Sequence, residues 1–152
     1  MSTRLAVIGA GPGGYAAAFH AADLGMQVTL IDADPNPGGV CTFRGCIPSK
    51  ALLHAAKVLD EAKHADVYGV TFGKPSIDVN KLRAWKDKVV KTQTGGLGLL
   101  AKSRKVTYVQ GRASFVNAKT LSVATGGGEQ KVEADYIIIA TGSQPTRVPN
   151  VS

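Results

Sequence analysis

The chain has 152 residues, 44% hydrophobic and 19% charged, a balance that excludes disordered and fibrous proteins and fits one soluble globular domain. No apolar run reaches the roughly 18 residues of a membrane span, and no signal peptide is evident, so we expect a cytoplasmic protein without membrane contact. The net charge of +7 is concentrated between residues 81 and 105. Because no nucleic-acid motif accompanies this charge, we expect a solvated basic helix and no nucleic-acid partner, although an anionic ligand or an acidic partner would use the same charge.

The first third of the sequence predicts a strand, a helix and a second strand. Residues 4–8 are a short apolar run before Gly9, residues 13–25 are rich in small side chains and end at Gly25, and residues 27–32 are a second apolar run. Strand, helix and strand over about thirty residues make a βαβ unit with a right-handed crossover.

The rest of the chain predicts two longer helices and several strands. In chain order these are a helix from Pro48 to near Lys63, a helix over 78–102 that weakens at Gly95-Gly96, a strand over 105–110, an antiparallel hairpin of 120–125 and 130–135, and a buried parallel strand over 136–140. Residues 144–152 have no periodicity and resemble a linker. We therefore predict one domain over 1–143 and the start of a linker over 144–152.

The predicted fold class is α/β, a Rossmann-like three-layer domain. A parallel sheet has helices on one face and a small antiparallel hairpin or meander on the other. The expected strand order is third, second, first, and then the 136–140 strand after a gap.

The segment after the first strand fits the G-x-G-x-x-G pattern, with glycines at 9, 11 and 14. Its context supports a dinucleotide site, because a strand precedes it, a helix follows, and Asp32 ends the second strand. The helix N-terminus would bind a pyrophosphate and Asp32 the ribose hydroxyls. The motif alone does not distinguish FAD, NAD and NADP.

Both cysteines, Cys41 and Cys46, follow in one short segment. They could form half a metal site, a structural pair or a redox dithiol. A zinc site needs four ligands, and the histidines (His20, His54 and His64) are poorly spaced, so we predict no metal.

The five-residue spacing restricts the backbone between the cysteines. In a regular helix such residues lie roughly 7.5 Å apart along the axis and about 140° around it, which is poor for a disulfide. We therefore expect Cys41 in irregular backbone, with Gly45 supplying freedom and the regular helix starting at Pro48. Arg44, the helix N-terminus and Lys50 are expected to favour thiolates.

Residues 39–50, with the pattern G-V-C-x-x-x-G-C-I-P-S-K, resemble the signature of the pyridine nucleotide–disulfide oxidoreductases. Within that family, the continuation into Ala-Leu-Leu-His at 51–54 is most similar to the dihydrolipoamide dehydrogenases. The resemblance covers almost the whole chain. Asp32 departs from it by replacing the usual Glu, and Phe43-Arg44 by replacing the common Asn-Val.

The resemblance implies a role for each matching residue. Cys41 would be the outer thiol that exchanges with dihydrolipoamide, Cys46 the inner thiol against the flavin, and Lys50 an electrostatic aid near the flavin. The residues that would contact FAD are Gly9, Gly11, Pro12, Gly13, Gly14, Asp32, Gly39, Val40, Thr42, Lys50, Gly111, Arg112, Ala113, Ala140, Thr141 and Gly142.

The implied activity is oxidation of protein-bound dihydrolipoamide, with FAD and the dithiol as carriers and NAD as final acceptor. A lipoyl-bearing acyltransferase component and a homodimer partner are the implied partners of the full-length enzyme. Since the family's nicotinamide and interface domains would follow Ser152, we expect this chain to bind FAD weakly and not to turn over alone. Two alternatives remain: another flavin disulfide reductase (mercuric, glutathione or quinone reductase-like), and a non-catalytic regulatory module of the same fold.

Overall fold

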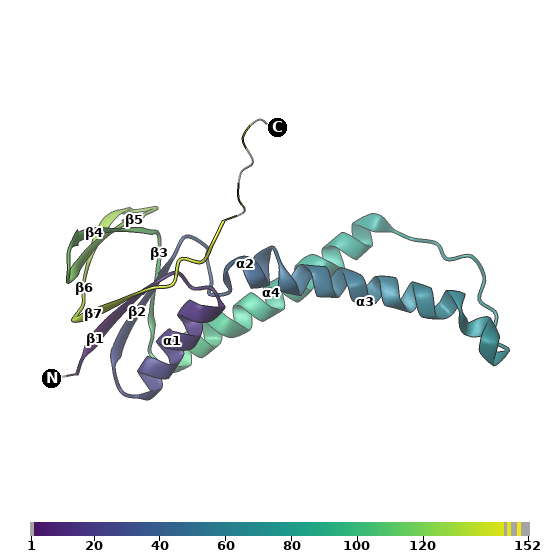
Figure 1. The fold of residues 1–152 in the computed structure, drawn as a ribbon, viewed down its shortest axis with the longest axis horizontal. Helices are drawn as coiled ribbons and strands as arrows, with labels where there is room; N and C mark the ends of the chain where they lie inside the picture. Colours follow the sequence, from purple (N-terminus) through teal and green to yellow (C-terminus); the bar gives the residue numbers. More distant parts are fainter. Residues whose placement is uncertain (1, 145, 147–148, 150–152) are drawn as a thin grey trace.

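The computed structural model describes residues 2–144, 146 and 149, and shows an α/β domain from which two long helices extend (Figure 1). The elements in chain order are β1 (Arg4–Ile8), α1 (Pro12–Asp23), β2 (Gln27–Asp32), α2 (Gly39–Phe43), α3 (Cys46–Lys63), the 3-10 helix η1 (Ala65–Tyr68), α4 (Val79–Ser103), β3 (Thr107–Gln110), β4 (Arg112–Asn117), β5 (Thr120–Thr125), β6 (Gly128–Glu133) and β7 (Tyr136–Ile139). Most of the expected linker, 144–152, lies outside the described residues.

The central sheet is parallel, with the strand order β3-β2-β1-β7. The prediction of a gap before the last strand was wrong, because β7 pairs directly with β1, with Val7 opposite Ile138. Two hydrogen bonds between Arg4 and Asp135 lie at the beginning of this strand pair. The Asp135 N–H donates to the Arg4 carbonyl at 2.9 Å, and the Arg4 N–H donates to the Asp135 carboxylate at 2.9 Å. The two strands therefore leave no room for a strand between them.

Alternation along the strands builds two hydrophobic layers, one on each face of the sheet. Leu5 and Val7 pack with α1, including Ala18, and with Ala101 of α4. Ala6 faces the opposite layer, since successive strand residues point to opposite faces. Burial on both faces explains why β1 and β2 are almost continuously apolar.

The second face of the parallel sheet is covered by a three-stranded antiparallel sheet in the order β4-β5-β6. Leu121, Val123 and Val132 of this small sheet pack against Ala6 and Ile31 of the parallel sheet. The expected hairpin corresponds to β5 and β6, whereas β4 was not predicted. The predicted fold class, with helices on one face and a small antiparallel meander on the other, is confirmed.

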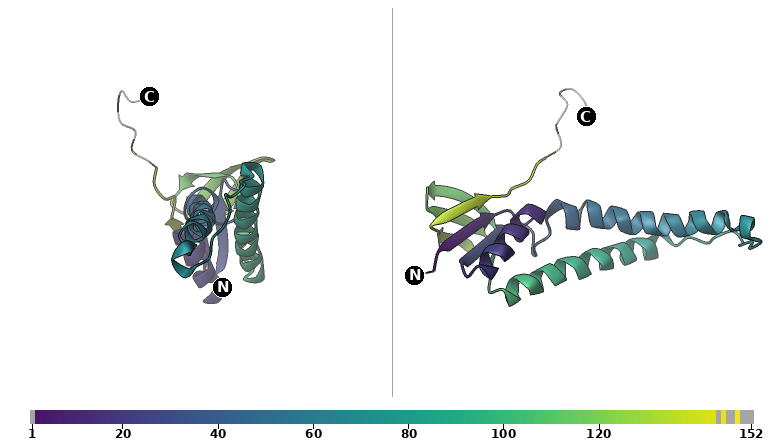
Figure 2. Two further views of the ribbon diagram at one scale, coloured as in Figure 1. Left: turned by 90° about the vertical axis from the view of Figure 1, so that its right-hand side faces the viewer. Right: turned by 60° about the horizontal axis from the view of Figure 1, so that its bottom comes forward.

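Helices α3 and α4 run side by side and extend well beyond the sheets (Figure 2). The predicted weakening at Gly95-Gly96 was wrong, because α4 is continuous from Val79 to Ser103. The neighbouring Thr94 is only 3% exposed and donates to the Val90 carbonyl at 3.1 Å. Tertiary packing therefore overrides the low helix propensity of glycine. No helix in the described part of the chain combines the length and apolar character of a membrane crossing.

Candidate dinucleotide and dithiol site

The segments that follow β1, β3 and β7 converge with the end of β2 at the carboxyl edge of the parallel sheet. Gly9 follows β1 and donates its N–H to the Ile31 carbonyl at 2.8 Å. Gly111 follows β3 and donates to the Asp32 carbonyl at 2.8 Å, and Ala140 follows β7 and donates to the Ile8 carbonyl at 2.7 Å. The carboxyl edge of an open α/β sheet is where ligands of such folds bind.

The turn between β1 and α1 presents the start of the helix to this edge. A Cβ on Gly14 would lie 1.7 Å from the Gly9 carbonyl oxygen, so only glycine allows this approach of helix and turn. The N-cap residue Gly11 provides no side-chain cap, and the first intrahelical bond runs from the Tyr15 N–H to the Gly11 carbonyl at 2.9 Å. The amides of Gly13 and Gly14 can therefore receive an anion such as a pyrophosphate.

Asp32 ends β2 beside this turn, as the sequence predicts. Its carboxylate accepts hydrogen bonds from the Ala10 N–H at 2.6 Å and the Asp34 N–H at 3.0 Å. Each carboxylate oxygen keeps a second lone pair, so Asp32 can still accept bonds from a ligand's hydroxyls. The two amide bonds fix its orientation.

The turn and the cysteine segment meet backbone to backbone. The Gly38 N–H donates to the Ala10 carbonyl at 2.8 Å. Gly39 has φ +59°, and a Cβ built there would come within 2.5 Å of the Gly11 Cα. This contact places the start of α2, and hence Cys41, directly beside the candidate phosphate site.

The cysteines lie on either side of a break between two helices. Cys41 lies in α2 and Cys46 is the first residue of α3, with Arg44 and Gly45 outside both helices. The expectation of irregular backbone at Cys41 was wrong, and the regular helix starts at Cys46, not Pro48. The irregular backbone lies between the cysteines instead, which still satisfies the geometric requirement because it interrupts the helix. Both cysteines are free thiols, with Cys41 half-buried and Cys46 exposed.

The thiol pKa of Cys41 is raised, whereas the sequence predicts a lowered one. A hydrogen bond with Cys46, then desolvation and the charge of Cys46, raise the pKa of the Cys41 thiol, while Lys50 opposes the rise. The Arg44 guanidinium is directed to Asp34 instead, and binds its carboxylate at 2.8 and 3.2 Å. The prediction that Arg44, the helix N-terminus and Lys50 together favour thiolates is therefore wrong for Cys41, whose pKa is raised, although Lys50 acts in the expected direction.

The remaining predicted residues are distributed around this centre. Val40 is 59% exposed, whereas Thr42 is 5% exposed and packs against Gly38. Arg112 is exposed at the start of β4, and Ala113 packs into the layer between the two sheets. Lys50 is exposed one turn beyond Cys46 on α3, and Thr141 and Gly142 are exposed after Ala140.

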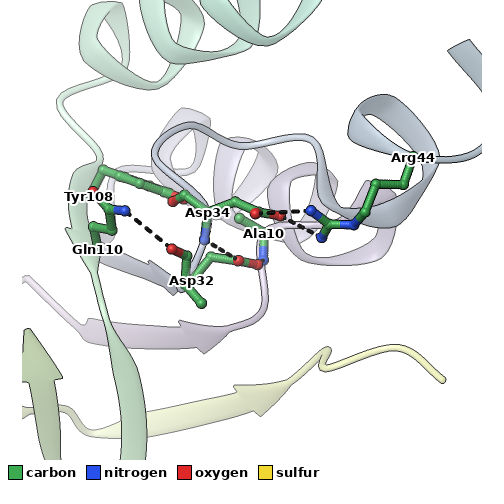
Figure 3. A network of polar contacts seen from close by, with 7 residues as sticks. Ala10, Asp32, Asp34, Arg44, Tyr108 and Gln110 are labelled. Carbon is green, nitrogen blue, oxygen red and sulfur yellow. Dashed lines mark hydrogen bonds and ion pairs between the residues drawn. The ribbon is translucent and has the colours of Figure 1, made fainter. Parts of the chain in front are cut away.

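A polar network that the sequence did not predict surrounds Asp34 (Figure 3). The Tyr108 hydroxyl donates to the Asp34 carbonyl at 2.7 Å, and the Gln110 amide donates to the Ala33 carbonyl at 3.1 Å. Burial, followed by the charges of Asp32 and Asp34, raises the pKa of Tyr108 and keeps it a neutral donor. These bonds fix the loop between β2 and α2 to strand β3.

The sequence profile described as pyridine nucleotide-disulphide oxidoreductase matches residues 3–152. The chain belongs to this family. It is 46% identical over 149 residues to the dihydrolipoyl dehydrogenase of Vibrio cholerae and 48% identical over 150 residues to that of Haemophilus influenzae, in each case over 98% of the chain. It is also 46% identical over 150 residues to the dihydrolipoyl dehydrogenase of Geobacillus stearothermophilus, over 99% of the chain.

Membership of the pyridine nucleotide-disulphide oxidoreductase family agrees with a Gly-rich turn beside a pair of cysteines. The chain spans about a third of the length of these relatives, 31% for Vibrio cholerae and 32% for Geobacillus stearothermophilus. Within the described residues, no three His, Cys, Asp or Glu side chains are grouped so that they could hold a metal ion.

Proposed function

We propose that this chain forms the FAD-binding and dithiol-bearing part of a dihydrolipoyl dehydrogenase. The observation that supports this most is the contact between Gly39 and Gly11, which joins the anion-binding turn to the helix that carries Cys41. A redox cofactor and a dithiol must be neighbours if electrons are to pass between them. The names of the relatives support the same function.

The cofactor part of the proposal rests on the turn and on the ends of the four parallel strands. Gly9, Gly11, Pro12, Gly13 and Gly14 would hold the FAD pyrophosphate on the N-terminus of α1. Asp32 would bind the adenosine ribose, and 111–113 and 140–142 would line the site through their backbone. Gly39, Val40 and Thr42 would lie along the path to the flavin, which would accept an electron pair from the thiols.

The dithiol part assigns a different role to each cysteine. Cys41 would exchange with dihydrolipoamide, Cys46 would face the flavin, and Lys50 would add positive charge near both. In the exchange, the dithiol of dihydrolipoamide and the disulfide of the protein give lipoamide disulfide and the protein dithiol. The electron pair would then pass with one proton, as a hydride, to NAD⁺. The second proton of the dithiol would be released to solvent.

The complete activity belongs to a longer enzyme of the relatives' kind. NAD as final acceptor, a lipoyl-bearing acyltransferase component as substrate carrier, and a homodimer partner are proposals for that enzyme. They follow from the resemblance and not from the geometry of residues 2–144.

A flavin fluorescence titration tests the cofactor part. FAD at low concentration is titrated with excess chain, and we expect saturable quenching that ADP reverses by competition, since the turn and Asp32 would bind the ADP half. Riboflavin, which lacks that half, should not compete.

The matched variant is Asp32→Ala, which removes the candidate ribose contact and should weaken FAD binding severalfold. Glu129→Ala, an exposed acidic residue on β6, serves as the control of equal charge change. Quenching that ADP does not reverse, or equal binding by all three proteins, would contradict the FAD assignment.

A further inference from the structure

The break between α2 and α3 is the part of the chain that sets how the two thiols face each other. Arg44 (φ −135°, ψ −5°) and Gly45 (φ −123°, ψ −105°) both lie outside helical geometry. Cys41 precedes this break and Cys46 follows it. Any restraint on Arg44 therefore acts on the relative positions of the thiols.

Arg44 is restrained from outside the break, by Asp34. Two guanidinium nitrogens donate to the two carboxylate oxygens, at 2.8 and 3.2 Å. The paired bonds fix both the distance and the plane of the guanidinium, because each oxygen faces its own N–H. The Asp34 side chain is 20% exposed and that of Arg44 is 59% exposed, so the contact is partly shielded from water on the Asp34 side.

Asp34 is itself immobilised by the sheet. Its N–H donates to the Asp32 carboxylate at 3.0 Å and its carbonyl accepts from the Tyr108 hydroxyl at 2.7 Å. The other Asp32 oxygen accepts from the Ala10 N–H at 2.6 Å. A continuous chain of bonds thus runs from the Gly-rich turn through Asp32 and Asp34 to Arg44 (Figure 3).

We propose that Asp34 and Arg44 are positioning residues that hold the break in the geometry in which Cys41 and Cys46 form a disulfide. The inference rests on the proposed function, since it assigns these two residues to the same dithiol. A restrained break raises the effective concentration of one thiol at the other, and so favours the disulfide over the dithiol. Release of Arg44 lowers that effective concentration.

The expected shift is modest because the pair is partly exposed, and exposed ion pairs contribute little. We expect Arg44→Gln to weaken the disulfide about threefold to fivefold, equivalent to roughly 14–21 mV at about 30 mV per tenfold for a two-electron couple. Asp34→Asn keeps the shape of the side chain and should give the same shift. Arg44→Lys keeps the charge but loses the paired bonds, so its shift should lie between zero and the shift of Arg44→Gln.

The experiment equilibrates the chain with glutathione buffers of increasing disulfide content and counts alkylated thiols by mass spectrometry. The reaction is balanced: one protein dithiol and one glutathione disulfide give one protein disulfide and two glutathione thiols. Arg104→Gln is the matched control, because Arg104 pairs with Asp23 at 3.1 Å away from the cysteines. Thermal unfolding of every variant shows which of them remain folded.

The inference is supported if Arg44→Gln and Asp34→Asn shift the midpoint, Arg104→Gln does not, and the exchanged pair Asp34→Arg with Arg44→Asp recovers part of the loss. Midpoints equal to that of the wild-type chain in both single variants would overturn it while leaving the proposed function intact. A wild-type chain that forms no disulfide at any ratio would contradict the proposed function and this inference with it.

Discussion

Gly39 and Gly11 touch through their backbones, because a Cβ on Gly39 would come 2.5 Å from the Gly11 Cα. The N–H of the preceding residue, Gly38, donates to the Ala10 carbonyl at 2.8 Å. The Gly-rich turn and the start of α2, the helix that carries Cys41, are thus one packed unit. Four consequences of the structure can be measured.

The first prediction concerns the contact itself. Gly39→Ala introduces a side chain at φ +59° and against Gly11, whereas Gly25→Ala does so at φ +85° where a Cβ would meet no described atom within 4 Å. Left-handed backbone alone costs about 1–2 kcal/mol, and overpacking adds about 1–3 kcal/mol. Urea denaturation should therefore show a larger loss of unfolding free energy for Gly39→Ala. Equal losses in the two variants would show that the contact has no energetic weight.

The second prediction concerns the pKa of Cys41. Hydrogen bonding with Cys46, desolvation and the charge of Cys46 raise this pKa, and Lys50 lowers it. The rate of alkylation at Cys41 by iodoacetamide should thus reach its midpoint above the ordinary thiol value of about 8.5. Cys46→Ala should lower that midpoint and Lys50→Met should raise it. A midpoint below the ordinary value in the wild-type chain would contradict the raised pKa of Cys41.

The third prediction concerns acid stability. A hydrogen bond from the Arg4 side chain, supported by the Arg4 N–H and charge, lowers the pKa of Asp135 in the folded state. A lowered folded-state pKa means that the stabilisation is complete above the unfolded pKa of about 3.9 and is lost as the pH falls through the folded value. The thermal midpoint of Asp135→Asn should lie below that of the wild type at pH 7, and the difference should vanish in acid. A difference that persists at pH 2 would contradict the assignment.

The fourth prediction concerns the edge of the parallel sheet. Within the described residues β7 pairs only with β1, and Tyr136, Ile138 and Ile139 are 68%, 38% and 65% exposed. An apolar strand with a free edge invites pairing with a second chain. We expect concentration-dependent association in light scattering.

Charged residues at this edge should reduce the association. The test variant is Tyr136→Lys with Ile138→Lys, which places two charges on alternate residues of β7. Phe72→Lys is the control, since Phe72 is 61% exposed in the segment between η1 and α4. If the control variant alone becomes monomeric, association involves the tip of the long helices and not β7.

The sequence predicts the βαβ unit, the Gly-rich turn and Asp32, because each has a local signal such as an apolar run or a glycine at fixed spacing. It does not predict β4, where every residue except Ala113 is exposed and no alternation marks a buried face. β4 pairs with β5 across a two-residue turn, with Asn117 opposite Thr120, and this turn carries no glycine or proline that would signal a hairpin.

The errors at the site come instead from contacts between different elements, which the local sequence does not record. Arg44 lies between the cysteines in the sequence, and so we expected its charge to act on them. The structure turns it to Asp34, ten residues earlier, at 2.8 Å. Likewise, the Gly95-Gly96 pair signals a weak helix, but α4 is continuous. Thr94 is buried and Gly98 packs against Asn36, and these contacts stabilise the helix on both sides of the pair. Local propensity is overridden wherever side chains from distant segments meet.

Cys41 and Cys46 should form one reversible redox pair. The most direct measurement uses mass spectrometry. The dilute chain is oxidised, its remaining thiols are alkylated, and the mass of the product is determined before and after addition of reductant. We expect two thiols to disappear together in the monomer, reductant to restore both, and Cys41→Ser to leave Cys46 reduced under the same conditions. Independent oxidation of the two cysteines, or a disulfide only between chains, would contradict it.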